Sequence, residues 1–110
     1  MLDYDLMPAA ERFFRKVKES DPVLPGKYKK AIRAICENPY IGTFKKGELT
    51  GYMGYDIVHN NINYEMAYII GKNADGKIIV IVMAGTRENF YDELKNYNNA
   101  NKRKIEKLKG

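Results

Sequence analysis

The chain has 110 residues, of which 45% are hydrophobic and 30% charged, and it carries a formal net charge of +5. This length and composition predict one soluble globular domain and exclude an intrinsically disordered protein. The longest apolar run, residues 78–84, is far too short to span a bilayer, and the N-terminal residues do not resemble a secretory signal. We therefore expect a cytoplasmic protein that does not act at a membrane.

The first half of the chain predicts one short strand and two helices. Residues 2–7 alternate weakly and suit a strand, after which Pro8 suits the first turn of a helix that runs to about Ser20. A second apolar stripe predicts a helix from about Lys27 to Glu37. Cys36 falls on that stripe and is interpreted as a buried small hydrophobe in a reducing compartment.

The second half predicts a three-stranded meander and a final helix. Asn60-Asn61 suits a two-residue hairpin turn, because asparagine tolerates positive φ angles. With one histidine and one cysteine in the chain, no cluster of zinc ligands can form, and we expect neither a metal nor a cofactor. The predicted strands cover about Met53–His59, Ile62–Gly71 and Lys77–Ala84, and the helix covers about Glu88–Tyr97.

The last ten residues, "NKRKIEKLKG", hold five basic residues and one acidic residue. With only Ile105 and Leu108 as large apolar groups, this segment can bury little by itself. We interpret residues 1–97 as the single domain and residues 98–110 as a basic tail that is either weakly ordered or a weak helix extension. The tail, including Arg103, suits binding to a polyanion; the alternative is a solvated helix face and a frayed end.

The order βααβββα predicts an α+β fold, in which an antiparallel sheet of about four strands carries two helices on one face. The other face is then left to solvent or to a partner. A two-residue turn at Asn60-Asn61 places Asp56 directly opposite Glu65 on this second face. Like charges in that position destabilise a sheet unless a proton or a cation relieves them.

Arg87 follows the last strand, from which it can reach the Asp56–Glu65 pair. The functional interpretation is an acid/base pair that Arg87 steadies. Two alternatives remain open at this point. The cluster can be purely structural, or a three-residue turn can shift the register and separate the acids. His59 lies at a strand end on the apolar face and is interpreted as structural.

The chain resembles the RelE/ParE superfamily of bacterial type II toxins in the order and spacing of five short motifs, which span about residues 3–97. The resemblance implies a toxin that a cognate antitoxin neutralises. RelE-like members are ribosome-dependent mRNA endonucleases, whereas ParE-like members inhibit DNA gyrase. The motifs read "MPAAERFFRKVK", "ICENPYIG", "LTGYMGYDI", "NYEMAYII" and "IVMAGTREN".

The RelE branch implies that Arg87 and Tyr91 take part in RNA cleavage, where Arg87 stabilises charge on the phosphate and Tyr91 acts as the acid. Glu65 is then the expected base, with its pKa held up by Asp56, while Lys45 and Lys46 help to bind phosphate. The departures are equally clear. Positions that are basic in the family fall on Asp56, Val58 and Glu65 here.

Three hypotheses follow from these residues. The first is a RelE-like mRNA endonuclease that binds the ribosome and mRNA. The second is a ParE-like inhibitor that binds DNA gyrase or another protein and performs no chemistry. The third is a non-toxic binding module on the same fold.

Overall fold

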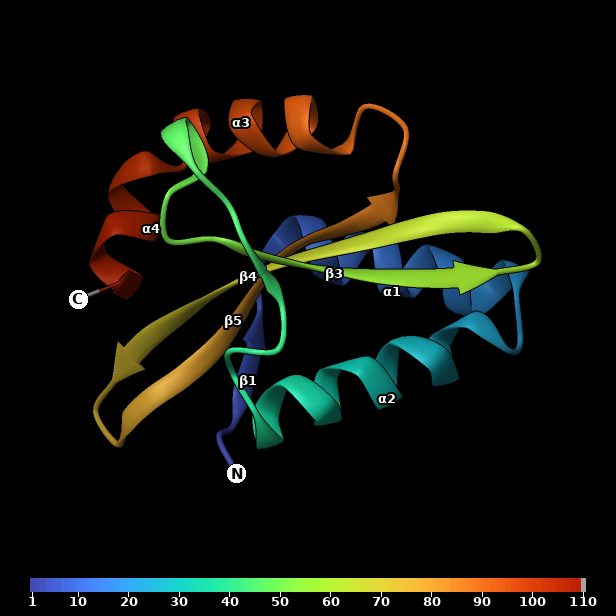
Figure 1. Cartoon of the computed structure of the whole chain (residues 1–110), viewed down its shortest axis with the longest axis horizontal. Coiled ribbons are helices and arrows are strands. Elements are labelled where there is room, and N and C mark those ends of the chain that lie inside the picture. The colour runs from blue at the N-terminus through green and yellow to red at the C-terminus, as the bar shows by residue number, and fades with distance from the viewer. Residues whose placement is uncertain (110) are drawn as a thin grey trace.

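The computed structural model describes residues 1–109, so Gly110, the last residue of the predicted tail, lies outside it. Residues 1–109 form five strands, four α-helices and one short 3-10 helix (Figure 1). In chain order these are β1 Tyr4–Leu6, α1 Pro8–Ser20, α2 Leu24–Glu37, β2 Thr43–Phe44, the 3-10 helix Gly47–Leu49, β3 Met53–His59, β4 Ile62–Asn73, β5 Gly76–Thr86, α3 Phe90–Ala100 and α4 Lys102–Lys109.

The five strands form one mixed sheet in the order β1-β5-β4-β3-β2. The meander β3-β4-β5 is antiparallel as predicted, whereas β1 lies parallel to β5, with Tyr4 opposite Ile79. The expectation of about four antiparallel strands was therefore wrong in two respects. The direction was wrong because the alternation of apolar and polar residues does not show which way a strand runs. The number was wrong because β2 has two residues, too few for such an alternation to be recognised.

The helix α1 has the predicted bounds, but α2 begins three residues earlier than expected. The Asp21 carboxylate accepts hydrogen bonds from the backbone N–H groups of Val23 and Leu24, at 2.9 and 3.1 Å. This side chain satisfies donors at the helix start that have no partner within the helix. Pro25 is tolerated in the first turn, where no intrahelical N–H bond is lost.

The helices α1 and α2 cover one face of the sheet and form the first core. Ile32, Ile35 and Ile57 are buried in this core. Three aromatic residues are half-buried and pack against it, with their rings around Tyr28. These three are Phe13, Phe14 and Tyr64.

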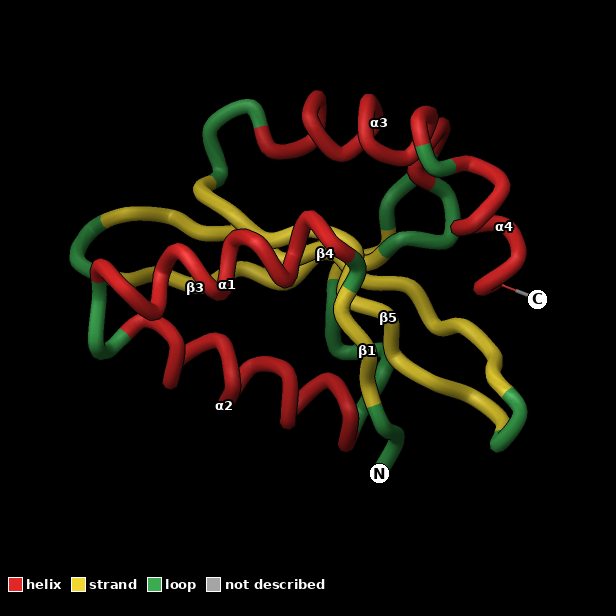
Figure 2. Tube along the Cα trace, turned by 180° about the vertical axis from the view of Figure 1, so that it is seen from behind, coloured by secondary structure: helices red, strands yellow, loops and turns green. Residues whose placement is uncertain are grey.

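The second face is not open, because α3 and α4 cover most of it (Figure 2). β5 is apolar on both faces, with Ile79 and Ile81 in the first core and Val80 and Val82 in the second. A strand that is apolar on both faces has to be covered on both sides. The hairpin end of β3 and β4 stays uncovered, and there Val58 is 61% exposed.

The predicted tail folds onto the sheet as α4, which is a separate helix after a break at Asn101. Ile105 is completely buried in the second core. α4 also approaches β4 so closely that a Cβ atom on Gly71 would lie 2.6 Å from the carbonyl oxygen of Leu108. Within residues 1–109, no helix combines the length and apolar character needed to cross a membrane.

Candidate functional site

The hairpin β3-β4 sets the geometry of the candidate site. Asn60 and Asn61 both adopt left-handed conformations, with φ angles of 51° and 62°, which suit a two-residue turn. Asp56 consequently lies directly opposite Glu65 in the sheet. The predicted register is confirmed, and the alternative of a three-residue turn is excluded.

Glu65 is the centre of a cluster of polar side chains. Its side chain is only 2% exposed, although it lies near the uncovered end of the sheet. The hydroxyl group of Tyr91 donates a hydrogen bond to Oε2 of Glu65 at 2.9 Å. Nε of Arg87 lies 3.7 Å from Oε1, and the Arg87 side chain is 61% exposed. The structure thus brings together Asp56, Glu65, Arg87 and Tyr91.

The chain places Arg87 and Tyr91 by continuing β5 two residues further than predicted, to Thr86. The backbone N–H of Arg87 donates to the carbonyl of Asn63 at 2.8 Å, which fixes Arg87 beside β4. Asn89 then adopts a left-handed conformation, with φ of 58°, and α3 begins at Phe90. This sharp turn directs the first turn of α3 back over Glu65.

The pKa of Glu65 is raised from 4.5 to about 7. Burial is the larger cause, and a hydrogen bond with the Asp56 carboxyl group is the next. The Tyr91 hydroxyl and the positive charge of Lys45 act in the opposite direction. Burial and the neighbouring Glu65 raise the pKa of Tyr91, so that its hydroxyl group stays protonated at neutral pH. The sequence had suggested Asp56 as the cause of a raised pKa, whereas desolvation contributes more.

Lys45 joins this cluster and Lys46 does not. Nζ of Lys45 lies 4.4 Å from the centroid of the Tyr91 ring, in a cation–π contact. Lys46 is exposed, and within residues 1–109 its side chain forms no hydrogen bond or ion pair with the cluster. Arg103 lies on α4, which packs near Gly71 on β4. Six residues separate Gly71 from Glu65, or about 20 Å along the strand.

Gly54 is a site residue that the sequence interpretation missed. A Cβ atom at this position would lie 2.7 Å from the hydroxyl oxygen of Tyr91 and 2.8 Å from Cε of Lys45. The missing side chain therefore makes the space in which Lys45 and Tyr91 meet. A glycine inside a predicted strand often marks such a close approach, and this signal could have identified it.

His59 lies outside the cluster, on the side of α1 and α2. Its Nε2 atom lies 2.9 Å from Oδ2 of Asp21, and the residue is 5% exposed. Among residues 1–109, no group of three His, Cys, Asp or Glu side chains could hold a metal ion.

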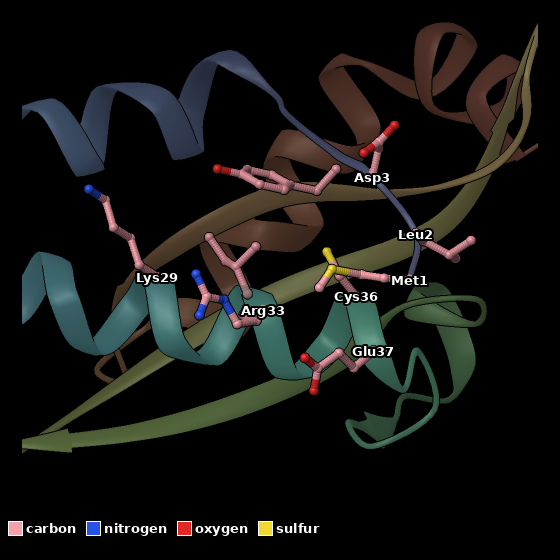
Figure 3. Close-up of a pocket in the computed structure, with 9 residues that line it drawn as sticks. Met1, Leu2, Asp3, Lys29, Arg33, Cys36 and Glu37 are labelled. Atoms are coloured by element: carbon pink, nitrogen blue, oxygen red, sulfur yellow. The ribbon is translucent and has the colours of Figure 1, made fainter.

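A separate hollow of about 490 Å³ lies between the N-terminal segment and α2, where Lys29, Arg33 and Cys36 line it (Figure 3). None of the clustered residues contributes to this hollow.

Comparison with known protein families identifies the family to which the chain belongs. The model of the ParE-like toxins of type II bacterial toxin-antitoxin systems matches residues 7–95. The chain belongs to this family of toxins. Family membership implies a cognate antitoxin as a partner. No curated protein matches the sequence of the chain.

Two solved toxin structures are similar to this toxin. One is a YoeB/ParE toxin from Agrobacterium tumefaciens, with a TM-score of 0.67, 14% sequence identity, and coverage of 78% of this chain and 99% of that chain. The other is a mutant of the Escherichia coli toxin RelE in the free state, with a TM-score of 0.65, 15% identity, and coverage of 86% and 92%. At these identities the likeness shows the fold alone.

Proposed function

We propose that this toxin inhibits translation by cleaving ribosome-bound mRNA, with the Asp56–Glu65 carboxyl pair as the acid/base centre. The observation that carries the proposal is the placement of Glu65. A carboxyl group with a pKa of about 7 lies in hydrogen-bond contact with a tyrosine and beside an exposed arginine. A base with a pKa near neutrality is well suited to proton transfer at physiological pH.

The burial of Glu65 changes the role expected from the sequence. A side chain that is 2% exposed cannot itself reach a ribose hydroxyl group, whereas Asp56 is exposed. We assign proton removal to the pair, with Asp56 as the member that contacts the 2′-hydroxyl group. Before the reaction both carboxylates are charged, and their repulsion raises the basicity of the pair. Glu65 then shares the proton that Asp56 takes up, which leaves one negative charge on the pair.

The reaction balances with the residues of the cluster alone. Asp56 takes the proton of the 2′-hydroxyl, and the 2′-oxygen attacks the phosphorus atom. The bond from phosphorus to the 5′-oxygen breaks, and Tyr91 donates its proton to that oxygen. The proton held by the carboxyl pair then returns to Tyr91 across the 2.9 Å bond from Glu65. The products are a 2′,3′-cyclic phosphate and a 5′-hydroxyl group.

Arg87 and Lys45 supply the positive charge for the phosphate. The guanidinium group of Arg87 is mostly exposed, so it can rotate from Glu65 toward a phosphate oxygen. Lys45 lies over the Tyr91 ring, next to the proton donor. Removing one group that stabilises transition-state charge typically lowers the rate by about a hundredfold or more.

Induction of the protein in cells, followed by primer-extension mapping of cellular mRNAs, tests the proposal. We expect new mRNA ends with the wild type, and their loss in Arg87→Ala and Asp56→Asn at equal protein levels. Arg12→Ala is the matched control, because Arg12 is an exposed arginine on α1, far from the cluster in the sequence. Arrested growth without new mRNA ends in the wild type would contradict RNA cleavage.

A specific observation favours a second candidate function. Asp56, Val58 and Glu65 occupy positions that are basic in the RelE-like branch, so the site offers RNA less positive charge. A ParE-like toxin that binds DNA gyrase or another protein target needs no such charge. In that case DNA replication fails before translation after induction, and Glu65→Gln leaves the growth arrest intact.

A further inference from the structure

The outer edge of β3 borders a groove that the proposed reaction does not use. β2 pairs only with Met53 and Gly54, so residues 55–59 have no neighbouring strand on that side within the described sheet. α2 runs alongside this edge and leaves a groove of about 260 Å³, which we call the α2–β3 groove. Its lining consists of Lys27, Lys30, Ala31, Ala34, Tyr55, Asp56 and Ile57.

The helix wall of the groove is positively charged. Residues 27, 30, 31 and 34 follow helical spacing and therefore share one side of α2. Lys27 and Lys30 are exposed, and within residues 1–109 neither forms an ion pair with a carboxylate. The two alanines are too small to fill the space between helix and strand. The groove thus combines an open floor with two ammonium groups that are not paired with a carboxylate.

The groove and the candidate active site share one residue, Asp56. This residue lines the groove and also lies opposite Glu65. Lys45 and Arg87 lie on the other sides of the same carboxyl pair. An RNA strand whose scissile phosphate lies at Asp56 and Glu65 can therefore cross the edge of β3. Its neighbouring phosphates would then lie close to Lys30 and Lys27.

We infer that the α2–β3 groove binds the phosphate backbone of single-stranded RNA next to the cleaved bond, through Lys27 and Lys30. The inference rests on the proposed function and adds a second contact region for the same substrate. The main alternative occupant is a protein segment that pairs with the open edge of β3. Nζ of Lys27 already donates to the Val58 carbonyl at 3.1 Å, and a lysine at a strand edge opposes strand addition.

Binding of a short fluorescent 2′-O-methyl RNA, which cannot be cleaved through its 2′-oxygen, tests the inference. Affinity is measured by fluorescence anisotropy over a range of NaCl concentrations. We expect Lys27→Gln/Lys30→Gln to weaken binding and to reduce the slope of log K against log[NaCl] by about 1.4, or about 0.7 for each lost phosphate contact. Glutamine at position 27 can still donate to the Val58 carbonyl.

Lys29→Gln/Arg33→Gln is the matched control, because it removes two exposed charges from the other side of α2. We expect its slope to equal that of the wild type. Equal slopes in both double variants, an unchanged slope in Lys27→Gln/Lys30→Gln, or no binding by the wild type would each overturn the inference. Loss of binding to a protein partner with RNA binding unchanged would instead identify a protein surface and overturn it too.

The two proposals fail separately. If primer extension shows no cleavage but the two groove lysines still carry the salt dependence of RNA binding, RNA cleavage is rejected and the groove stands. If cleavage occurs and the groove lysines contribute nothing to the slope, the groove is rejected and the acid/base centre stands. Thermal unfolding of each variant shows whether a lost effect comes from lost folding.

Discussion

At the scale of single residues, the main feature of this toxin is a carboxyl group kept where its charge is unfavourable. Glu65 is almost completely buried, and its neighbours include another carboxyl group. Tyr91 donates to it, and Tyr28 donates to its backbone carbonyl at 3.1 Å. Such an arrangement reduces stability in exchange for a proton that can be moved near neutral pH.

The pKa of Glu65 predicts how stability depends on pH. The pKa of Glu65 is about 7 in the folded protein and 4.5 for an unperturbed glutamate, which represents the unfolded chain. Between these two pH values the folded state therefore binds more protons than the unfolded state. The free energy of unfolding therefore falls by up to roughly 3 kcal/mol as pH rises from 4.5 to about 7. Above pH 7 it levels off. Urea unfolding at several pH values measures this loss.

Glu65→Gln should remove this part of the pH dependence, because glutamine does not titrate. Above pH 7 the variant should be more stable than the wild type and less toxic. The Arg87 side chain is 61% exposed and its Nε lies 3.7 Å from Oε1, so this long contact contributes little and its loss should not reverse the sign. If the variant keeps the wild-type pH slope, or is less stable above pH 7, Glu65 is a structural partner of Arg87 instead.

Gly54→Ala tests the space shared by Lys45 and Tyr91. The new Cβ atom would displace the Tyr91 ring and the end of the Lys45 side chain, so we expect about 1–3 kcal/mol of lost stability. The hydrogen bond from Tyr91 to Glu65 should break, and growth arrest should be lost. Gly26→Ala, with no atom within 4 Å of its new Cβ, should keep toxicity and gain up to about 1 kcal/mol.

At the scale of elements, α4 shows that a charged segment can still belong to the core. Its exposed positions carry the basic residues, while Ile105 is completely buried against the second face of the sheet. Gly71 allows the backbone of α4 to approach β4. The positive charge of this segment is therefore carried on an ordered helix.

Ile105→Ala should destabilise the protein by about 2–4 kcal/mol, because it removes a fully buried side chain and leaves a cavity. Deletion of residues 102–110 also removes Ile105, so it should lower the melting temperature at least as much as Ile105→Ala does. Lys104→Ala, at an exposed position of the same helix, should change stability by less than about 0.5 kcal/mol. An unchanged melting temperature after the deletion would show that α4 does not stabilise the fold.

At the scale of the whole molecule, two hydrophobic cores share one sheet. Alternate residues of β4 belong to opposite cores, with Met66 and Tyr68 in the first and Ala67 and Ile69 in the second. Neither core can lose its packing without exposing one face of the same strand. The molecule should therefore unfold as a single cooperative unit.

Two tryptophan reporters test this cooperativity, since the chain has no tryptophan. Phe14→Trp reports on the first core and Tyr97→Trp on the second, and both positions are half-buried. In each variant the fluorescence transition in urea should coincide with the loss of far-UV circular dichroism. If Tyr97→Trp reported unfolding at a lower urea concentration than Phe14→Trp, α3 and α4 would detach first. That result would contradict unfolding as a single unit.

The local features of this protein follow from short stretches of its sequence. The bounds of α1 follow from Pro8 and an apolar stripe, and the β3–β4 register follows from a turn of two asparagines that accept positive φ. The opposition of Asp56 and Glu65 is a consequence of that register. These features could be predicted because each depends on residues that are close together in the chain.

Which surfaces are covered depends instead on contacts between distant parts of the chain. The parallel pairing of β1 with β5 joins residues about 75 positions apart, and the packing of α3 and α4 closes a face that alternation alone left open. The same packing buries Glu65 beneath Tyr91, 26 residues away, and brings Lys45 over that ring. Because desolvation is the main cause of the raised pKa of Glu65, the acid/base character of the site depends on long-range contacts.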